Sequence, residues 1–167
     1  MKKLVLVTAC LALAATSLVA QNRKSPHESV SAKIGDSSVD ITYGRPYAKG
    51  RKIVGGLVPY GEVWRTGADE ATTLKTPGDL MIGDLAVPAG EYALFTLPTA
   101  DGWKLIVNKT AKQWGAFKYD AAMDLGRTDM MVGKTGGAVE QFTIAVDGGK
   151  IVMSWEMTQA SVSIAAK

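Results

Sequence analysis

The sequence predicts an all-β fold in a single domain with long ordered loops, either an antiparallel β-sandwich of jelly-roll-like type or a barrel. Three observations support this prediction. Short segments alternate apolar and polar residues, glycine and proline turns separate these segments, and no long stretch shows helical periodicity. Many short strands joined by such turns are typical of sandwiches and barrels.

Residues 1–20 are expected to be a signal peptide and not part of the fold. Two lysines precede an uncharged apolar run over residues 4–15, and residues 16–20 end in a small residue, which is the layout of a secretory signal. Acylation of Cys10 as a lipoprotein is a minority alternative, because the apolar run before it is short and continues after it. No later apolar run reaches the roughly 20 residues that span a bilayer. We expect an exported protein, periplasmic or extracellular, without a transmembrane segment.

Processing changes the charge and the cysteine content of the chain. The whole sequence carries a formal charge of +3, and removing Lys2 and Lys3 lowers it to +1, because residues 1–20 contain no acid. This near-neutral balance gives no electrostatic argument for nucleic acid as a partner. Residues 21–167 contain no cysteine. An exported domain without disulfides must be held together by its hydrophobic core.

Residues 21–27 are expected to form a flexible arm, and residues 28–167 the domain. Alternating runs at 28–34 and 39–43 flank a Gly-Asp-Ser turn and predict a β-hairpin. Residues 44–59 are rich in glycine and proline, which predicts a loop. Their apolar residues indicate that this loop is packed against the domain. A Val-Pro-x-Gly-Glu frame occurs at 58–62 and again at 87–91, and we interpret it as a turn that starts a strand.

The second half of the chain is more regular. Alternation at 92–97 and 103–108 predicts a second hairpin, and alternation at 139–146 and 151–156 predicts a third across Asp147-Gly148-Gly149. Residues 129–132 are expected to form a short strand, and Val162 and Ile164 a short edge strand. Residues 109–127 lack strand alternation and predict a loop with one short helix.

The candidate site centres on residues 55–73, where turn formers, aromatic residues, an arginine and two adjacent carboxylates lie close together. Arginine suits bidentate binding of carboxylate or phosphate, and exposed aromatic rings suit stacking on sugars. A groove for a small anionic or carbohydrate ligand, or for an envelope partner, is predicted to be lined by eight residues: His27, Arg45, Arg51, Trp64, Arg65, Asp69, Glu70 and Trp114. The structural alternative is that the arginines pair with Asp69, Glu70 and Glu62.

The signals for catalysis are weak. Asp69 and Glu70 would face opposite sides of a strand and could converge only in a turn, so a glycosidase carboxylate pair does not follow from their spacing. A Ser-His-Asp triad can be composed from Ser25 or Ser29 with His27 and Asp69, but no Gly-x-Ser-x-Gly elbow supports it. A single histidine without cysteine argues against a zinc site. No metal, no cofactor and no catalytic residue are predicted, with Asp69, Glu70 and His27 as weak catalytic candidates.

Several motifs together resemble one family. They are Ser-Pro-His-Glu at 25–28, Ile-Thr-Tyr-Gly-Arg-Pro at 41–46, Lys-Gly-Arg at 49–51, the stretch 55–73, Pro-Ala-Gly-Glu-Tyr at 88–92 and Asn-Lys…Gln-Trp-Gly at 108–115. The chain resembles the exported bacterial family catalogued as Domain of Unknown Function 2911 over almost all of residues 21–167. The resemblance implies a secreted or periplasmic β-rich domain, seen mostly in Gram-negative bacteria, and implies no activity. The pattern of that family has Asn at the position of Asp69.

The leading hypothesis from the sequence is therefore a non-enzymatic, exported ligand-binding module. One alternative is a hydrolase acting on envelope glycans or esters, with Asp69 or Glu70 as the acid/base and Arg65 stabilising an anion. The other alternative is a structural envelope protein without a ligand site.

Overall fold

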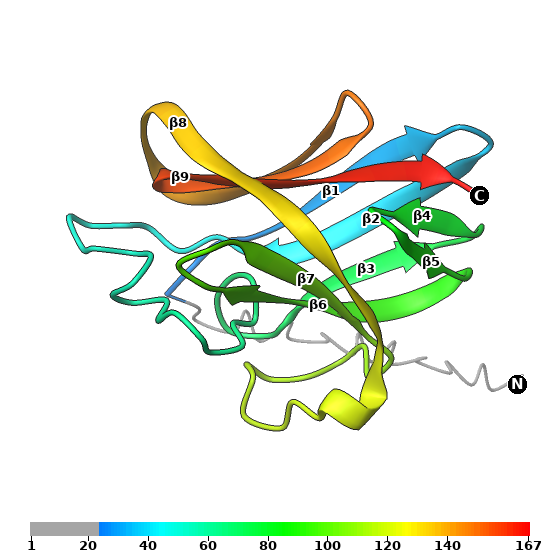
Figure 1. Cartoon of the computed structure of the whole chain (residues 1–167), viewed down its shortest axis with the longest axis horizontal. Helices are drawn as coiled ribbons and strands as arrows, with labels where there is room; N and C mark the ends of the chain where they lie inside the picture. Colours follow the sequence, from blue (N-terminus) through cyan, green and yellow to red (C-terminus); the bar gives the residue numbers. More distant parts are fainter. Residues whose placement is uncertain (1–23) are drawn as a thin grey trace, which may run out of the picture.

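The computed structural model describes residues 24–167, so the expected signal peptide and Cys10 lie outside the described residues. The described chain forms nine strands and one short 3-10 helix (Figure 1). These elements are β1 (His27–Ile34), β2 (Ser37–Gly44), β3 (Thr72–Thr76), β4 (Leu80–Ile82), β5 (Leu85–Val87), β6 (Gly90–Pro98), β7 (Trp103–Asn108), η1 (Ala121–Met123), β8 (Asp124–Asp147) and β9 (Lys150–Ala166). Within residues 24–167, no helix is long and apolar enough to cross a membrane.

All nine strands belong to one antiparallel sheet in the order β1-β2-β3-β6-β7-β8-β9-β4-β5, with β1 and β5 at its open edges. The expected all-β antiparallel class is confirmed. The expectation of a two-sheet sandwich or a closed barrel is wrong, because β8 and β9 are long enough to pair with both halves of the strand order. In Figure 1, β8 and β9 arch over the strands below them and continue the sheet.

The connection between β3 and β4 requires this sheet to curl. Only residues 77–79 separate the two strands, although β3 is third and β4 is eighth in the sheet. Five strand spacings of about 4.8 Å would place them roughly 24 Å apart in a flat sheet. The connection can reach at most about 15 Å, at roughly 3.8 Å for each Cα step. The two ends of the sheet must therefore approach each other.

All three expected hairpins form. Gly35, with a φ of 57°, opens the turn between β1 and β2, and Gly148 and Gly149, with φ of 53° and 70°, form the turn between β8 and β9. Left-handed residues at these positions suit two-residue hairpin turns. The strands β8 and β9 are much longer than expected, with 24 and 17 residues. The short strand expected at 129–132 is part of β8. Residues 162–164 lie in β9, which is flanked by β8 and by β4 through residues 164–166, so they are not an edge strand.

The Val-Pro-x-Gly-Glu frame leads into a strand only at its second occurrence. Residues 87–91 run directly into β6, as expected. After the first occurrence, Trp64 forms only an isolated bridge to Thr96 of β6, through a reciprocal pair of backbone hydrogen bonds of 2.8 and 2.9 Å. The chain then turns away from the sheet.

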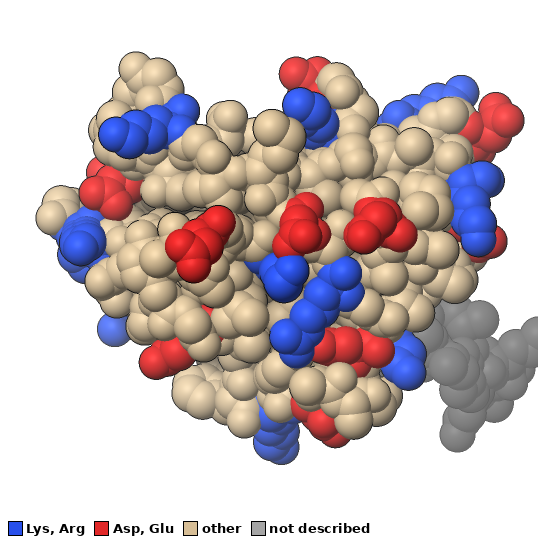
Figure 2. Space-filling view, viewed as in Figure 1, with Lys and Arg blue, Asp and Glu red and all other residues tan. Residues whose placement is uncertain are grey.

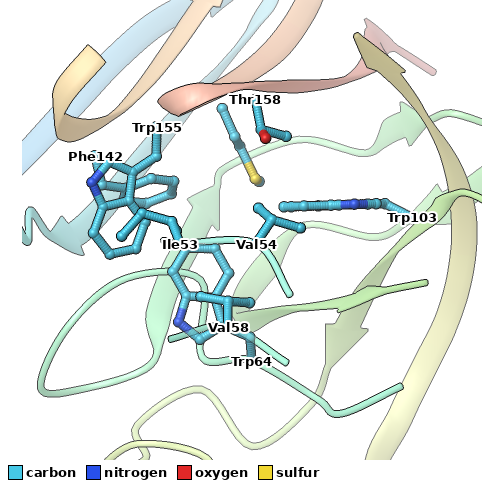
Figure 3. Close-up of a pocket in the computed structure, with 9 residues that line it drawn as sticks. Ile53, Val54, Val58, Trp64, Trp103, Phe142, Trp155 and Thr158 are labelled. Atoms are coloured by element: carbon cyan, nitrogen blue, oxygen red, sulfur yellow. The ribbon is translucent and has the colours of Figure 1, made fainter. Parts of the chain in front are cut away.

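The loop between β2 and β3, residues 45–71, is packed down as the sequence predicted. Ile53 and Val58 are each 1% exposed. Figure 3 shows their side chains beside Trp64, Phe142 and Trp155, with Trp64 and Trp155 stacked at 5.9 Å between ring centroids. The space left between these side chains is only about 10 Å³. It is close to the smallest cavity that holds a water molecule, so it is core packing and not a ligand site.

The strands β6 and β7 are covered on both faces. Leu94 and Leu105 face the main core, while Phe95 and Ile106 form a second, small core with Tyr119 of the loop that follows β7. That loop, expected at 109–127, ends at residue 123, directly before β8 begins, and contains the single 3-10 turn η1. On the face shown in Figure 2, lysine and arginine side chains are interspersed with aspartate and glutamate, so no single sign of charge dominates it.

Candidate functional site

The segment that organises the candidate site is the end of the loop between β2 and β3, residues 65–70. It crosses the end of β2 so closely that a Cβ on Gly44 would lie 2.2 Å from the carbonyl oxygen of Ala68. Thr66 and Asp69 have positive φ of 59° and 64°. A β-branched residue is a genuine outlier there, and such strain persists only where the surroundings hold it. The buried Thr66 is held, because its carbonyl accepts a 2.6 Å hydrogen bond from the Thr72 hydroxyl.

This backbone brings three candidate residues together. Asp69 and Glu70 both approach the ring of His27, at the start of β1. The His27 Nε2 lies 3.1 Å from Asp69 Oδ2 and 3.6 Å from Glu70 Oε2. The three side chains are partly buried, with 19%, 24% and 37% of their surface exposed. The sequence could place two adjacent carboxylates on one side only if they lay in a turn, and the left-handed Asp69 provides that turn. Asparagine and aspartate adopt this conformation more readily than other non-glycine residues.

A groove of about 530 Å³ opens beside this cluster. We refer to it as the Trp114 groove, and its lining is His27, Thr42, Tyr43, Gly44, Glu70, Ala71, Thr73, Lys112, Gln113 and Trp114. Its far wall comes from the loop after β7, which pairs with residues 69–71 through two backbone hydrogen bonds. Ala71 N donates to Gln113 O, and Gly115 N donates to Asp69 O, both at 2.9 Å. The groove thus joins two loops that are distant in sequence.

The wall of the Trp114 groove is held in place by Asn108, which the sequence interpretation passed over. Its side chain is fully buried and donates to the Asp120 carbonyl and to Asp124 Oδ1, at 3.0 and 2.9 Å. Its Oδ1 accepts from Thr110 N and from Gln113 Nε2, at 3.0 and 3.1 Å. The signal that could have identified it is a strand-ending Asn directly before a long loop, because such a side chain often satisfies loop backbone groups.

The same network includes an unusual tyrosine. The Tyr119 hydroxyl donates to Asp124 Oδ2 at 2.7 Å and accepts from Arg127 Nη2 at 2.8 Å. Burial, followed by the hydrogen bond to the Asp124 carboxylate, raises the pKa of Tyr119 to about 12. Arg127 Nε also donates to Asp124 Oδ2 at 3.0 Å. Each side-chain atom named in this network has a partner, so the network holds the loop in place, and only the other amide atom of Gln113, Oε1, is buried without one among the described residues.

A second depression of about 470 Å³ lies on the other side of residues 65–70. We refer to it as the Arg65 hollow, and its lining is Lys24, Ser25, Pro46, Tyr47, Lys49, Arg51, Leu57, Trp64, Arg65, Gly67, Ala68, Asp69 and Trp155. Four cationic side chains and one carboxylate are among these residues. The hollow is therefore electropositive by composition.

Arg65 has no partner within the described part of the chain. Its Nε is buried and makes no hydrogen bond, and no carboxylate of residues 24–167 lies within 4.0 Å of its guanidinium. The structural alternative, in which the arginines pair with Asp69, Glu70 and Glu62, is wrong for this residue. Asp69 turns toward His27, and Glu62 is exposed at the surface.

Arg45 and Arg51, by contrast, bind the protein itself. Arg45 donates to the Phe142 carbonyl and the Thr143 hydroxyl, at 3.1 and 2.9 Å, and its Nη1 pairs with Glu28. Arg51 donates to the Ala48 and Tyr47 carbonyls of its own loop, at 2.9 and 2.6 Å.

The two candidate tryptophans also differ, because one packs in the core and the other is exposed. Trp64 packs against Phe142 and Trp155 in the core and shows only part of its surface to the Arg65 hollow. Trp114 is 55% exposed at the wall of the Trp114 groove. Neither of these pockets includes Arg45, which the sequence interpretation had placed in a common groove. The remaining candidates divide between the Trp114 groove and the Arg65 hollow, and their role in ligand binding stays a prediction.

Comparison with known proteins gives one match. A family model described as "Protein of unknown function (DUF2911)" matches residues 25–164. No curated protein and no solved structure has significant similarity to the chain.

Proposed function

The chain belongs to the DUF2911 family, whose description assigns no activity, so we propose a function from the geometry of the site. We propose that this domain binds a small anionic ligand in the Arg65 hollow. The ligand would carry a carboxylate or phosphate group. The observation that carries the proposal is the buried Arg65 Nε, which has no acceptor among the described residues. A buried donor left unsatisfied costs about 1–3 kcal/mol, and more when the group is charged. A bound oxyanion supplies the acceptor that the protein does not.

The surroundings of Arg65 support an anion over a neutral ligand. Lys24, Lys49 and Arg51 line the same hollow and add positive charge. Arg51 already donates to two carbonyls, so its guanidinium is fixed in place while its charge still contributes to the local field. Trp64 and Trp155 supply an apolar wall. Small-molecule sites commonly combine such an apolar wall with a few convergent polar groups. The signal peptide expected at residues 1–20 would make this an exported binding module.

The test is a fluorescence titration of the full chain with phosphate, sulfate and a small dicarboxylate at low ionic strength, since salt screens exposed charges. Trp64 and Trp155 line the hollow and should report occupancy directly. We expect saturable binding by wild type, none by Arg65→Ala, and weakened binding by Arg65→Lys, which keeps the charge but lacks the planar fork.

The matched control is Lys104→Ala, which removes the same charge from an exposed pair with Asp129 away from the hollow. It should bind as wild type does. Equal affinity in wild type and Arg65→Ala, or no response to any anion of the panel, would contradict the proposal.

A second candidate function, carbohydrate binding in the Trp114 groove, is favoured by one specific observation. Trp114 presents 55% of its surface beside the groove, whose lining also offers Gln113, Lys112 and two threonines as hydrogen-bonding groups. Aromatic faces combined with polar groups suit sugars. Screening against a glycan panel should then show binding that Trp114→Ala removes. Phe117→Ala, which truncates an 84% exposed ring outside the groove lining, should leave that binding unchanged.

A further inference from the structure

The cluster of His27, Asp69 and Glu70 lies between the Arg65 hollow and the Trp114 groove, and the anion-binding proposal makes no use of it. One imidazole nitrogen and two carboxylate oxygens lie within 4.8 Å of one another. From this geometry we infer that the three side chains bind a divalent first-row transition-metal ion, such as zinc or manganese. The sequence interpretation predicted no metal because it counted a single histidine without cysteine.

The spacing of the donor atoms fits an ion placed between them. Zinc binds imidazole nitrogen and carboxylate oxygen at about 2.0–2.2 Å. At the angles of octahedral and tetrahedral coordination, neighbouring donors then lie roughly 2.8–3.6 Å apart. His27 Nε2 lies 3.1 Å from Asp69 Oδ2 and 3.6 Å from Glu70 Oε2. Both distances fall in this range, and the two carboxylate oxygens lie within 4.8 Å of each other, so small side-chain rotations would bring all three donors to one ion.

The imidazole and both carboxylates converge on one point. His27 Nε2 faces Asp69 Oδ2 and Glu70 Oε2 together, and imidazole nitrogen and carboxylate oxygen are both common ligands of divalent metal ions. Two adjacent carboxylates close to one another repel, and a divalent cation neutralises both. The backbone at Asp69 has a positive φ, which is unfavourable for most residues, and this conformation places the Asp69 and Glu70 side chains on the same side, next to His27.

The donor set selects the class of ion. Imidazole suits zinc, iron, nickel and copper, and carboxylates also suit manganese, while calcium and magnesium prefer oxygen ligands alone. Three protein ligands leave at least one coordination position open, as in catalytic and ligand-binding zinc sites. His27 and Glu70 line the Trp114 groove and Asp69 lines the Arg65 hollow, so that open position faces space that a ligand can enter.

The inference is tested by calorimetric titration of the chelator-treated, dialysed full chain with zinc and with manganese, and with calcium and magnesium for comparison. We expect one transition-metal ion per chain and much weaker binding of calcium and magnesium. His27→Ala and Glu70→Gln each remove a direct ligand, so their affinity should fall by more than the roughly 10- to 100-fold typical of changes to outer-shell partners. Glu62→Gln removes an equivalent charge from an exposed site and should bind as wild type does.

The variant Asp69→Asn tests the role of Asp69 as a metal ligand independently of its role in the turn. Asparagine also accepts positive φ, so this variant should fold with an unchanged thermal midpoint in the absence of metal and still lose affinity. Cobalt, whose visible absorption changes with its bound ligands, should give a spectrum with wild type that His27→Ala lacks. Absence of transition-metal binding by wild type would overturn the inference. Equal affinity in wild type, His27→Ala and Glu70→Gln would also overturn it, because the ion would then lie elsewhere. Neither result bears on anion binding at Arg65.

Discussion

The two ends of the loop between β2 and β3 each carry an arginine, and these two arginines differ in their hydrogen-bond partners. At the first end, Arg45 donates to the backbone and side chain of β8 and pairs with Glu28 of β1. At the second end, Arg65 has a buried Nε without any acceptor among residues 24–167. The Arg45 side chain therefore joins β1 and β8 to the loop after β2, whereas the Arg65 guanidinium makes no hydrogen bond or ion pair within the described fold. The comparison teaches that arginine content alone does not indicate a site, because only an unsatisfied guanidinium leaves donors for a ligand.

Removing Arg45 should cause the largest loss of stability. Its bonds to the Phe142 carbonyl and the Thr143 hydroxyl involve a charged donor, a class worth about 1.5–3 kcal/mol each. We expect Arg45→Ala to lose about 3 kcal/mol, which is roughly 6–12 °C in the thermal midpoint for a domain of this size. Thermal melts followed by circular dichroism measure this loss. Glu28→Gln removes only the ion pair, whose carboxylate is 49% exposed, and should cost at most about 1 kcal/mol. Equal losses in the two variants would contradict this division.

Adding an anion should make Arg65 contribute to stability as well. A ligand at about 100 times its dissociation constant stabilises the native state by roughly 2.7 kcal/mol, or about 5–11 °C for this chain. Wild type should show this shift in a melt with excess anion, and Arg65→Ala should not. A shift of the same size in both proteins would place the anion elsewhere.

Raising the pH should break the hydrogen bond from Tyr119 to Asp124, because a phenolate has no proton to donate and is repelled by the carboxylate. Tyr119 accepts from Arg127 and donates to Asp124, and its pKa of about 12 lies above the ordinary value of 10.0. Between pH 10 and 12 the unfolded tyrosine has lost its proton and the folded one retains it, so stability falls as pH rises through this range. Solvent near this partly buried group keeps the effect modest. Phenolate absorbance should reveal one tyrosine titrating near 12 that is absent in Tyr119→Phe, and a midpoint near 10 would contradict the network.

Removing Arg65 without ligand should cause the smallest effect. No hydrogen bond of the guanidinium is lost, and only contacts of its aliphatic stem disappear. We expect Arg65→Ala to change the unfolding free energy by less than about 1 kcal/mol, a shift of at most roughly 4 °C in the midpoint. A fall of ten degrees or more would show that Arg65 holds the fold and would remove the central residue of the proposed anion site.

Local turn chemistry explains which parts of the fold could be predicted. Gly35 and the Gly148-Gly149 pair identified their hairpins because a two-residue turn needs positive φ that only a few residues adopt. The same reasoning failed for β8. The segments at 129–132 and 139–146 were expected to be separate strands, but β9 pairs with β8 on both sides of residues 135–138 and the irregularity is absorbed as register shifts. The three-residue strands β4 and β5 were missed because they are too short to show alternation.

The sequence could name candidate residues for a site but not their arrangement. Residue types indicated that His27, Arg65 and Trp114 could contact a ligand, and the structure places each of them in a depression. Sequence spacing could not show that the Arg45 guanidinium would donate its hydrogen bonds to β8, about 100 positions later, because that contact depends on the order of strands in the sheet. Nor could it show that Asp69 would turn toward His27, because this depends on the close approach that Gly44 permits.

The curled sheet also has a kinetic consequence. The Tyr43 hydroxyl exchanges hydrogen bonds with both backbone groups of Ile144, 101 positions away, and the short link from β3 to β4 joins opposite ends of the strand order. The strands up to β7 cannot complete the sheet by themselves, because β4 and β7 need β9 and β8 as partners. Topologies dominated by such distant contacts fold on time scales of about milliseconds to seconds. Refolding from denaturant should accordingly be slow for a chain of this length, and the loop that carries Arg65 should order only when β8 and β9 have paired.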